Sequence, residues 1–218
     1  MNFIHRFEQG SIPKTLLLLH GTGGNEHDLI PVGQMLAPAW NLLSPRGQVL
    51  EHGMPRFFRR LAEGVFDQED LRLRTAELAR FLNDAAQTYG IDRARIVAAG
   101  YSNGANIAAS LLLTRPDALA GAILLRPMLP FEPETKPDLR GLPVFVAAGT
   151  QDRVLPRGSS QALIDVLRGS GADVTEYWHP GGHELSQQDL AAARRWLSER
   201  EAPALRGPAA APGHKAPR

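Results

Sequence analysis

The sequence predicts an α/β protein with a mostly parallel central sheet and helices on both faces. Short apolar runs alternate with segments of helical spacing along most of the 218 residues, a rhythm typical of repeated strand–helix–strand units. Several runs, such as residues 15–19, contain no polar residue in alternation, which indicates strands covered on both faces. A serine flanked by glycines also stands between one such run and a helical segment. A chain of this length suits one domain with a substantial core.

The strands are expected where apolar residues form short runs. Residues 3–7 alternate between apolar and polar, which indicates an edge strand with one face in water, and residues 172–178 alternate in the same way. The remaining runs are mostly apolar and are expected to form strands within the sheet: 15–19, 40–43, 95–99, 118–125 and 142–148.

The helices are expected between these strands. Residues 70–89 carry an apolar face between charged positions, and Gly90 ends the pattern. The other expected helices are 28–36, 105–113, 160–167 and 186–197. Two connections show no periodicity, the long stretch 48–67 and the proline-bearing segment 126–140. A connection as long as the first is usually functional or mobile.

Composition and charge limit the classes of partner. The formal net charge is +1, with charges scattered along the chain, which argues against a nucleic-acid surface and against a stable membrane association. There is no cysteine and no basic-then-apolar leader, so a cytoplasmic location is expected. Residues 1–202 are expected to form one folded domain. The Ala/Pro-rich tail 203–218 lacks apolar periodicity and is expected to be disordered.

The segment Gly100-Tyr101-Ser102-Asn103-Gly104 carries the strongest chemical signal. A strand that ends in Gly-x-Ser-x-Gly and turns at once into a helix is typical of a nucleophile elbow, which exposes the serine hydroxyl above the edge of the sheet. The helix that begins there directs unpaired backbone N–H groups and its positive end toward the serine. This arrangement favours chemistry in which an oxyanion develops, with Ser102 as nucleophile.

A serine hydroxyl needs an adjacent base, most often a histidine held by a carboxylate. In folds built on such an elbow the partners follow in the order Ser, Asp or Glu, His, each on a loop after a strand. Asp152 and His183 follow the last two expected strands and meet this condition. Asp138 remains an alternative acid and His179 an alternative base.

Backbone amides are expected to stabilise the oxyanion. One donor is Asn103, directly after the proposed nucleophile, and the other should come from the loop after an earlier strand. The glycine-rich turn 21–24 follows the strand 15–19, and Thr22 is its expected donor. A plain glycine turn is the alternative interpretation of that segment.

Other motifs fail for lack of a required residue. A dinucleotide fingerprint that starts at Gly21 needs a third glycine where Glu26 stands, and a His-Glu-x-x-His zinc motif that starts at His183 needs a histidine where Gln187 stands. A helical metal pair of His179 and His183 is excluded by Pro180 and the two glycines after it. We therefore predict no cofactor and no metal.

Five ordered motifs together resemble one known family. They are Leu-His-Gly-Thr-Gly-Gly-Asn-Glu (19–26), Ser-Pro-Arg-Gly (44–47), Gly-Tyr-Ser-Asn-Gly-Ala-Asn (100–106), Gly-Thr-Gln-Asp (149–152) and Gly-Gly-His-Glu (181–184). In this combination the chain resembles the phospholipase/carboxylesterase family of small α/β-hydrolases, up to about residue 197. It is closer to the bacterial carboxylesterases than to the acyl-protein thioesterases, which have Leu, Asp and Gln where Thr22, Gly24 and Asn103 stand.

The resemblance implies a serine carboxylesterase with an α/β-hydrolase fold. Its catalytic residues would be Ser102, Asp152 and His183, with Thr22 and Asn103 as oxyanion donors. Lids in this fold usually follow the strand after the elbow helix, and the connection 126–140 is too short for a cap domain. The expected cleft is therefore open.

The substrate is expected to be a small, soluble ester, and stretch 48–67 is the candidate pocket wall. Its candidate contacts are Phe57, Phe58 and Phe66 for apolar groups and Arg46 or Arg59 for a polar end, although the same aromatic residues would equally suit packing onto the body. An acyl thioesterase or lysophospholipase with the same catalytic residues, a peptidase or a C–C bond hydrolase, and a non-enzymatic binding protein remain alternatives. A homodimer through the last helix is possible.

Overall fold

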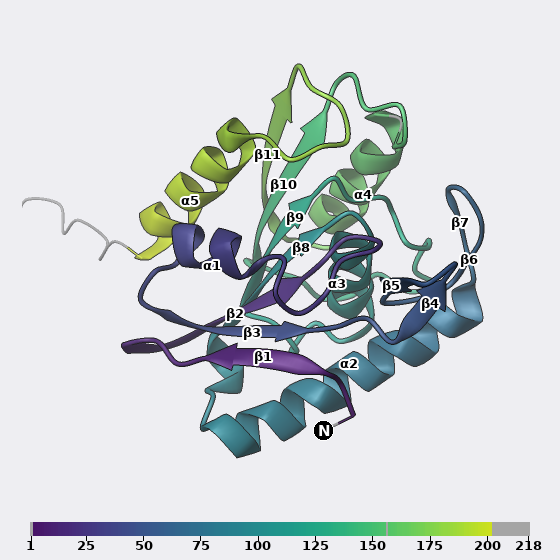
Figure 1. The fold of residues 1–218 in the computed structure, drawn as a ribbon. Coiled ribbons are helices and arrows are strands. Elements are labelled where there is room, and N and C mark those ends of the chain that lie inside the picture. Colours follow the sequence, from purple (N-terminus) through teal and green to yellow (C-terminus); the bar gives the residue numbers. More distant parts are fainter. Residues whose placement is uncertain (1, 156, 202–218) are drawn as a thin grey trace, which may run out of the picture.

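The computed structural model describes residues 2–155 and 157–201, and within them seven strands form one sheet (Figure 1). The strands lie in the order β1-β3-β2-β8-β9-β10-β11. Only β1 runs antiparallel to its neighbour, and the other described pairs in this sheet are parallel. The strand bounds are His5–Glu8 (β1), Ile12–Leu19 (β2), Trp40–Pro45 (β3), Ile96–Tyr101 (β8), Gly121–Leu125 (β9), Pro143–Gly149 (β10) and Asp173–His179 (β11). The predicted mostly parallel sheet is confirmed.

Five α-helices in the described part of the chain cover the two faces of this sheet (Figure 1). Their bounds are Ile30–Leu36 (α1), Gln68–Tyr89 (α2), Asn103–Thr114 (α3), Arg157–Gly169 (α4) and Gln187–Glu201 (α5), with a short 3-10 helix at Arg93–Arg95 (η1). α1 and α5 pack on one face, whereas α2, α3 and α4 pack on the other. Each helix predicted from the sequence is present, with ends shifted by a few residues.

The continuous apolar strands are explained by this double cover. Leu17 and Leu19 of β2 point into the core beneath α2 and α3, whereas Leu16 and Leu18 point into the core beneath α1. All four are fully buried, and complete burial of one leucine stabilises a fold by about 1.5–3 kcal/mol. In a strand covered on both faces, every apolar side chain therefore contributes to stability. A polar residue at every second position would remove half of this contribution.

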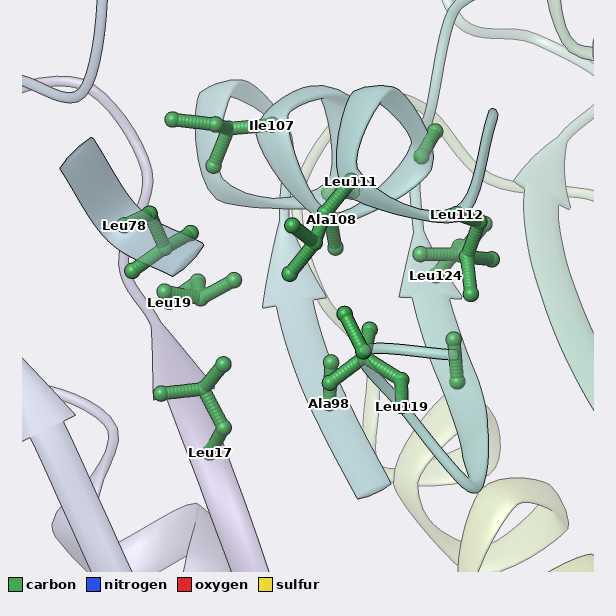
Figure 2. Close-up of a cluster of buried hydrophobic side chains, with 14 of the residues drawn as sticks. Leu17, Leu19, Leu78, Ala98, Ile107, Ala108, Leu111, Leu112, Leu119 and Leu124 are labelled. Atoms are coloured by element: carbon green, nitrogen blue, oxygen red, sulfur yellow. The ribbon is translucent and has the colours of Figure 1, made fainter. Parts of the chain in front are cut away.

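Helix α3 lies directly over the strands that lead to the serine. Figure 2 shows Ala108, Leu111 and Leu112 on the side of α3 that faces Ala98 and Leu124 of the sheet. Eleven of its residues, from the first to the last turn, are buried. This helix is buried on both sides because α2 packs against it opposite the sheet, where Ser110 of α3 and Thr75 of α2 share a hydrogen bond of 2.7 Å.

Helix α2 begins and ends at residues suited to those positions. The side chain of Asp67 caps its start by accepting a hydrogen bond of 3.0 Å from the backbone N–H of Asp70. Gly90 ends it in the left-handed conformation, with a φ of 67°. The predicted end at Gly90 is confirmed.

The stretch 48–67 is more regular than the sequence indicated. It contains two short antiparallel hairpins, Val49–Glu51 (β4) with Met54–Arg56 (β5) and Arg60–Ala62 (β6) with Val65–Phe66 (β7). Strands of two or three residues are too short to show a period-two pattern, which is why the segment was predicted to be irregular. The hairpins leave Leu50, Leu61 and Val65 largely exposed.

The tail 203–218, predicted to be disordered, lies outside the residues that the structure describes, as does residue 202 at the end of the predicted folded domain. The connection between β9 and β10 contains no helix or strand among its described residues. None of the helices in the described part of the chain has the length and apolar composition that a bilayer span requires.

Gly104 marks the closest approach of α3 to β2. A Cβ atom at this position would overlap the carbonyl group of Leu19 and lie 2.6 Å from the carbonyl oxygen of His20. Both contacts are with backbone, which cannot rotate away. The helix can therefore lie this close to the strand only because residue 104 has no side chain.

We expect Gly104→Ala to lower the free energy of unfolding by about 3 kcal/mol or more, since a well-packed core resists one extra carbon and the neighbours here are backbone. Gly158→Ala is the matched control, because a Cβ there meets nothing within 4 Å. It should change stability by less than about 1 kcal/mol. Urea unfolding measures both variants, and equal stabilities would contradict the packing argument.

Candidate active site

Ser102 occupies a strained turn between β8 and α3. Its φ of 52° and ψ of −112° place a residue with a side chain in a backbone region that such residues rarely adopt. The turn is held by its backbone N–H, which donates to the carbonyl oxygen of Leu125 over 2.9 Å, and by its carbonyl, which accepts from Asn106 over 3.0 Å. The strain is thus balanced by bonds from the neighbouring strand and from the helix.

Three side chains predicted from the sequence come together beside this turn. His183 Nε2 lies 2.9 Å from Ser102 Oγ, and His183 Nδ1 lies 2.8 Å from Asp152 Oδ2. Asp152 follows β10 and His183 follows β11, so each comes from the carboxyl end of a parallel strand. The result is a continuous chain of hydrogen bonds from a carboxylate through an imidazole to a hydroxyl.

The aspartate holds the histidine in one tautomer. Asp152 Oδ1 accepts the backbone N–H groups of Val154 and Leu155, at 2.8 and 2.7 Å, and its side chain is only 2% exposed. A carboxylate fixed in this way accepts a hydrogen bond from the N–H at Nδ1 of His183. Nε2 then carries a lone pair that faces Ser102. The imidazole is therefore oriented to accept the serine proton.

The two alternative residues lie elsewhere. Asp138 is exposed and pairs with Arg140 on the surface. His179 is buried, and its Nε2 lies 2.9 Å from Ser186 Oγ and 3.5 Å from an oxygen of Asp189. Neither alternative lines the cavity that contains Ser102.

Both expected oxyanion donors border the same cavity. Thr22 lies in the turn after β2, and Asn103 is the first residue of α3, where a backbone N–H has no partner within its own helix. The side chain of Asn103 has another role, because its Oδ1 accepts the backbone N–H of Phe57 over 2.7 Å. This bond joins the stretch 48–67 to the turn of Ser102.

A buried histidine supports the Thr22 loop. His20 Nδ1 lies 2.7 Å from the carbonyl oxygen of Gly21, and its Nε2 accepts the backbone N–H of Gly47 over 2.9 Å. This pattern requires a neutral ring with its proton on Nδ1. Burial lowers the pKa of His20, which favours the same neutral form.

Arg126 holds the loop that carries His183. It is fully buried, it adopts a φ of 56°, and its guanidinium pairs with Asp189 at 2.8 and 3.1 Å. The same guanidinium donates to the carbonyl oxygens of Gly182 and Glu184, the two neighbours of His183, at 2.9 and 3.0 Å. Sequence reasoning missed this residue, because the irregular segment 126–140 gives no signal of a buried charge.

The cavity beside Ser102 has a volume of about 240 Å³. Its lining combines Ser102 and His183 with polar, charged and apolar side chains from several loops. The residues are Thr22, Arg56, Arg60, Glu63, Gly64, Phe66, Tyr101, Ser102, Asn103, Asn106, Met128, Val154, Leu155 and His183. Sequence reasoning identified five of them, Thr22, Phe66, Ser102, Asn103 and His183, whereas Asp152 lies behind His183 and does not line the cavity.

Four predicted substrate contacts do not line this cavity, which corrects the sequence interpretation. Phe57 and Phe58 are 2% and 0% exposed and pack in the core beneath α2 and α3. Arg46 pairs with Glu26 and does not line the cavity. Arg59 points to the surface and pairs with Asp67.

The arginines that do border the cavity are Arg56, three positions before Arg59, and Arg60, directly after it. Their side chains belong to β5 and β6, whereas Phe57, Phe58 and Arg59 lie in the connection between the two hairpins. An ordered hairpin thus decides which arginine faces the serine, and the sequence showed no hairpin. The aromatic side chains were a misleading signal because core packing also selects them.

Among residues 2–155 and 157–201, no three or more His, Cys, Asp or Glu side chains are grouped so as to hold a metal ion. The predicted absence of a metal and a cofactor remains a prediction.

Comparison with known proteins now places the chain. The family model described as Phospholipase/Carboxylesterase matches residues 8–200. The chain belongs to the phospholipase/carboxylesterase family. It is 52% identical over 195 residues to the putative hydrolase MhqD of Bacillus subtilis (strain 168), covering 89% of this chain and 98% of that protein.

Solved structures of the family superpose closely on this chain. The carboxylesterase from Bacillus cereus is 48% identical, with a TM-score of 0.89 over 91% of this chain and 94% of that one. YahD, solved with malic acid, is 32% identical, with a TM-score of 0.86 over 90% and 98%. The chain thus has the α/β-hydrolase fold of a family of hydrolases and carboxylesterases.

Substitution of Arg126 is expected to lower activity strongly, although this residue does not contact Ser102. Arg126→Lys keeps the charge but loses the planar fork that bonds Gly182, Glu184 and Asp189 together. We expect kcat for p-nitrophenyl acetate to fall about 10- to 100-fold, because small misplacement of a catalytic group is costly, while KM changes little. Arg140→Lys, at an exposed surface pair, is the control. An unchanged kcat in a folded Arg126→Lys protein would contradict this role.

His20 predicts a loss of stability in acid. Since burial lowers its pKa in the folded state, the unfolded chain binds a proton that the folded protein does not, once the pH falls below about 6.5. Stability should therefore decline as the pH falls through and below that value. His20→Asn removes this linkage, so the stability advantage of the wild type over the variant should shrink from pH 7.5 to pH 5.5. Urea unfolding at both pH values measures it, and a constant difference would refute the assignment.

Proposed function

We propose that this protein is a serine carboxylesterase that hydrolyses small carboxylic esters through an acyl-enzyme on Ser102. The observation that carries the proposal is the hydrogen-bonded chain from Asp152 through His183 to Ser102, at 2.8 and 2.9 Å, on the border of an open cavity. An isolated serine hydroxyl is a weak nucleophile, and a histidine oriented by a carboxylate is the usual means of activating it.

In the first half of the proposed cycle, Ser102 Oγ attacks the ester carbonyl while His183 Nε2 accepts its proton. Negative charge then develops on the carbonyl oxygen. The backbone N–H groups of Thr22 and Asn103 donate hydrogen bonds to this oxygen and stabilise the charge. Because Asn103 begins α3, the positive end of the helix also favours this charge. His183 next protonates the leaving alcohol, and the acyl group remains on Ser102.

In the second half, water takes the place of the alcohol. His183 accepts a proton from this water, which attacks the acyl carbonyl, and the same backbone donors receive the second oxyanion. His183 then returns the proton to Ser102 Oγ as the acid leaves. Asp152 stabilises the protonated imidazole in both halves without taking the proton itself.

The size of the cavity supports a small substrate. At about 240 Å³ it lies below the range of 300–1,000 Å³ or so in which drug-sized ligands bind. The polar and charged residues on its border also suit a small polar molecule better than a long acyl chain. Malic acid, with which YahD was solved, is a molecule of that size and polarity.

A thioesterase or lysophospholipase could use the same residues, and the chain length of the best substrate separates these functions. We expect p-nitrophenyl acetate and butyrate to be hydrolysed with a higher kcat/KM than the palmitate ester. A maximum at palmitate would favour the lipid thioesterase instead.

Ser102→Ala should lower kcat on the best ester by about 10⁴-fold or more, since the acyl-enzyme can no longer form. Ser198→Ala is the matched control, because Ser198 lies exposed on α5 and bonds only the Arg195 carbonyl among the described residues. A fluorophosphonate probe should label the wild type and the control but not Ser102→Ala. Equal rates or equal labelling in all three proteins would refute Ser102 as nucleophile.

A further inference from the structure

Two arginines from the hairpins border the cavity that contains Ser102, and the proposed reaction uses neither. Arg56 is 3% exposed, and its Nη1 donates to Thr22 Oγ1 over 2.8 Å while its Nε donates to the carbonyl oxygen of Phe58 over 3.2 Å. Arg60 is more accessible, with its side chain 32% exposed. Arg56 therefore lies beside the Thr22 loop, and Arg60 lies nearer to solvent.

Both guanidinium groups contact the same carboxylate, that of Glu51. Glu51 lies 3.3 Å from Arg56 Nε and accepts from Arg60 Nε and Nη2, its closest contacts there being 2.9 and 2.7 Å. The hydrogen bonds from Arg60 hold the pKa of Glu51 below its ordinary value, so this carboxylate is ionised. One negative charge thus faces two positive charges, because an arginine stays protonated in proteins.

The other acidic groups near the cavity do not cancel this excess within its interior. Asp152 does not line the cavity, because His183 lies between its carboxylate and Ser102. Glu63 borders the cavity but is exposed, so water screens its charge. Among its lining residues the arginine, lysine and acidic side chains are therefore Arg56, Arg60 and the exposed Glu63, so the lining carries more positive than negative charge beside the Thr22 loop.

An excess of one positive charge suits a monoanion. Arg60 uses Nε and Nη2 to bind Glu51, so its Nη1 lies outside these bonds and can donate a charge-assisted hydrogen bond to a second carboxylate. Since the cavity is small and Arg56 touches Thr22, an anionic group held there lies only a few bonds from the reacting carbonyl.

We propose that the preferred substrate is a short ester that also carries a free carboxylate, which Arg60 binds with Arg56 behind it. This inference rests on the proposed esterase function and names its substrate class. The carboxylate belongs either to the acyl part, as in a half-ester of a dicarboxylic acid, or to the alcohol part, as in an acylated hydroxy acid.

Matched pairs of substrates isolate the charge. Monomethyl succinate and methyl succinamate differ only in a carboxylate against a carboxamide of the same shape, and they test the acyl side. O-acetylglycolate and O-acetylglycolamide test the alcohol side in the same way. For at least one pair, we expect the wild type to show a kcat/KM about 10-fold or more higher for the anion, and the excess should shrink in 0.5 M NaCl.

Arg60→Gln should bring this ratio close to one, mainly through a higher KM for the anionic ester. The fold should tolerate the change, because Glu51 keeps Arg56 as a partner. Arg60→Lys should retain part of the preference, since the charge remains. Arg59→Gln is the matched control, because Arg59 is the adjacent arginine but points away from the cavity, and its ratio should equal that of the wild type.

The outcomes separate this inference from the proposed function. Equal kcat/KM values of the wild type for the carboxylate and the carboxamide in both pairs would overturn the carboxylate site. The proposed esterase function would still stand. An anion preference that persists in Arg60→Gln would also overturn it. Failure to hydrolyse any of the four esters and p-nitrophenyl acetate would refute the esterase itself.

Discussion

The architecture depends on the close contact of α3 with β2 below the turn of Ser102. Because Gly104 brings the helix against the backbone of Leu19 and His20, the first turn of α3 and the loop after β2 lie next to each other. That contact brings the proposed nucleophile, the first residue of the helix and Thr22 to the border of the same cavity. A longer distance between helix and strand would separate the serine from the loop that is proposed to stabilise its product charge.

The parallel sheet supplies the other partners by topology. β2, β8, β10 and β11 all end at the same edge, so the residues that follow them meet without any of them being close in sequence. The loops themselves are then fixed by buried polar groups: His20 under the Thr22 loop and Arg126 under the His183 loop. Each of these groups satisfies backbone atoms that a loop leaves unpaired, which is why loops at this edge keep a defined shape.

The fold was predictable because its strands are long apolar runs and its long helix ends at a glycine. The grouping of Ser102, Asp152 and His183 could be predicted since their order along the chain and their place after strands are features of sequence. The pocket wall was not predictable in the same way. The side-chain directions of Arg56, Phe57 and Arg59 depend on hairpins of two or three residues, and such strands leave no periodic pattern. Arg126 was also missed, because burial of its charge depends on Asp189, which lies on a distant helix.

The attachment of the hairpins suggests how substrate range changes within this architecture. Residues 48–67 are joined to the body beside the proposed nucleophile by the Asn103 side chain, which holds Phe57, and to each other by Glu51, which holds Arg56 and Arg60. Beyond these anchors the hairpin tips are exposed and take no part in the core. Insertions and substitutions at the tips can therefore accumulate in evolution at little cost to folding. Loss of Glu51, by contrast, would remove the shared partner of Arg56 and Arg60 and so alter two lining residues of the cavity in a single mutational step.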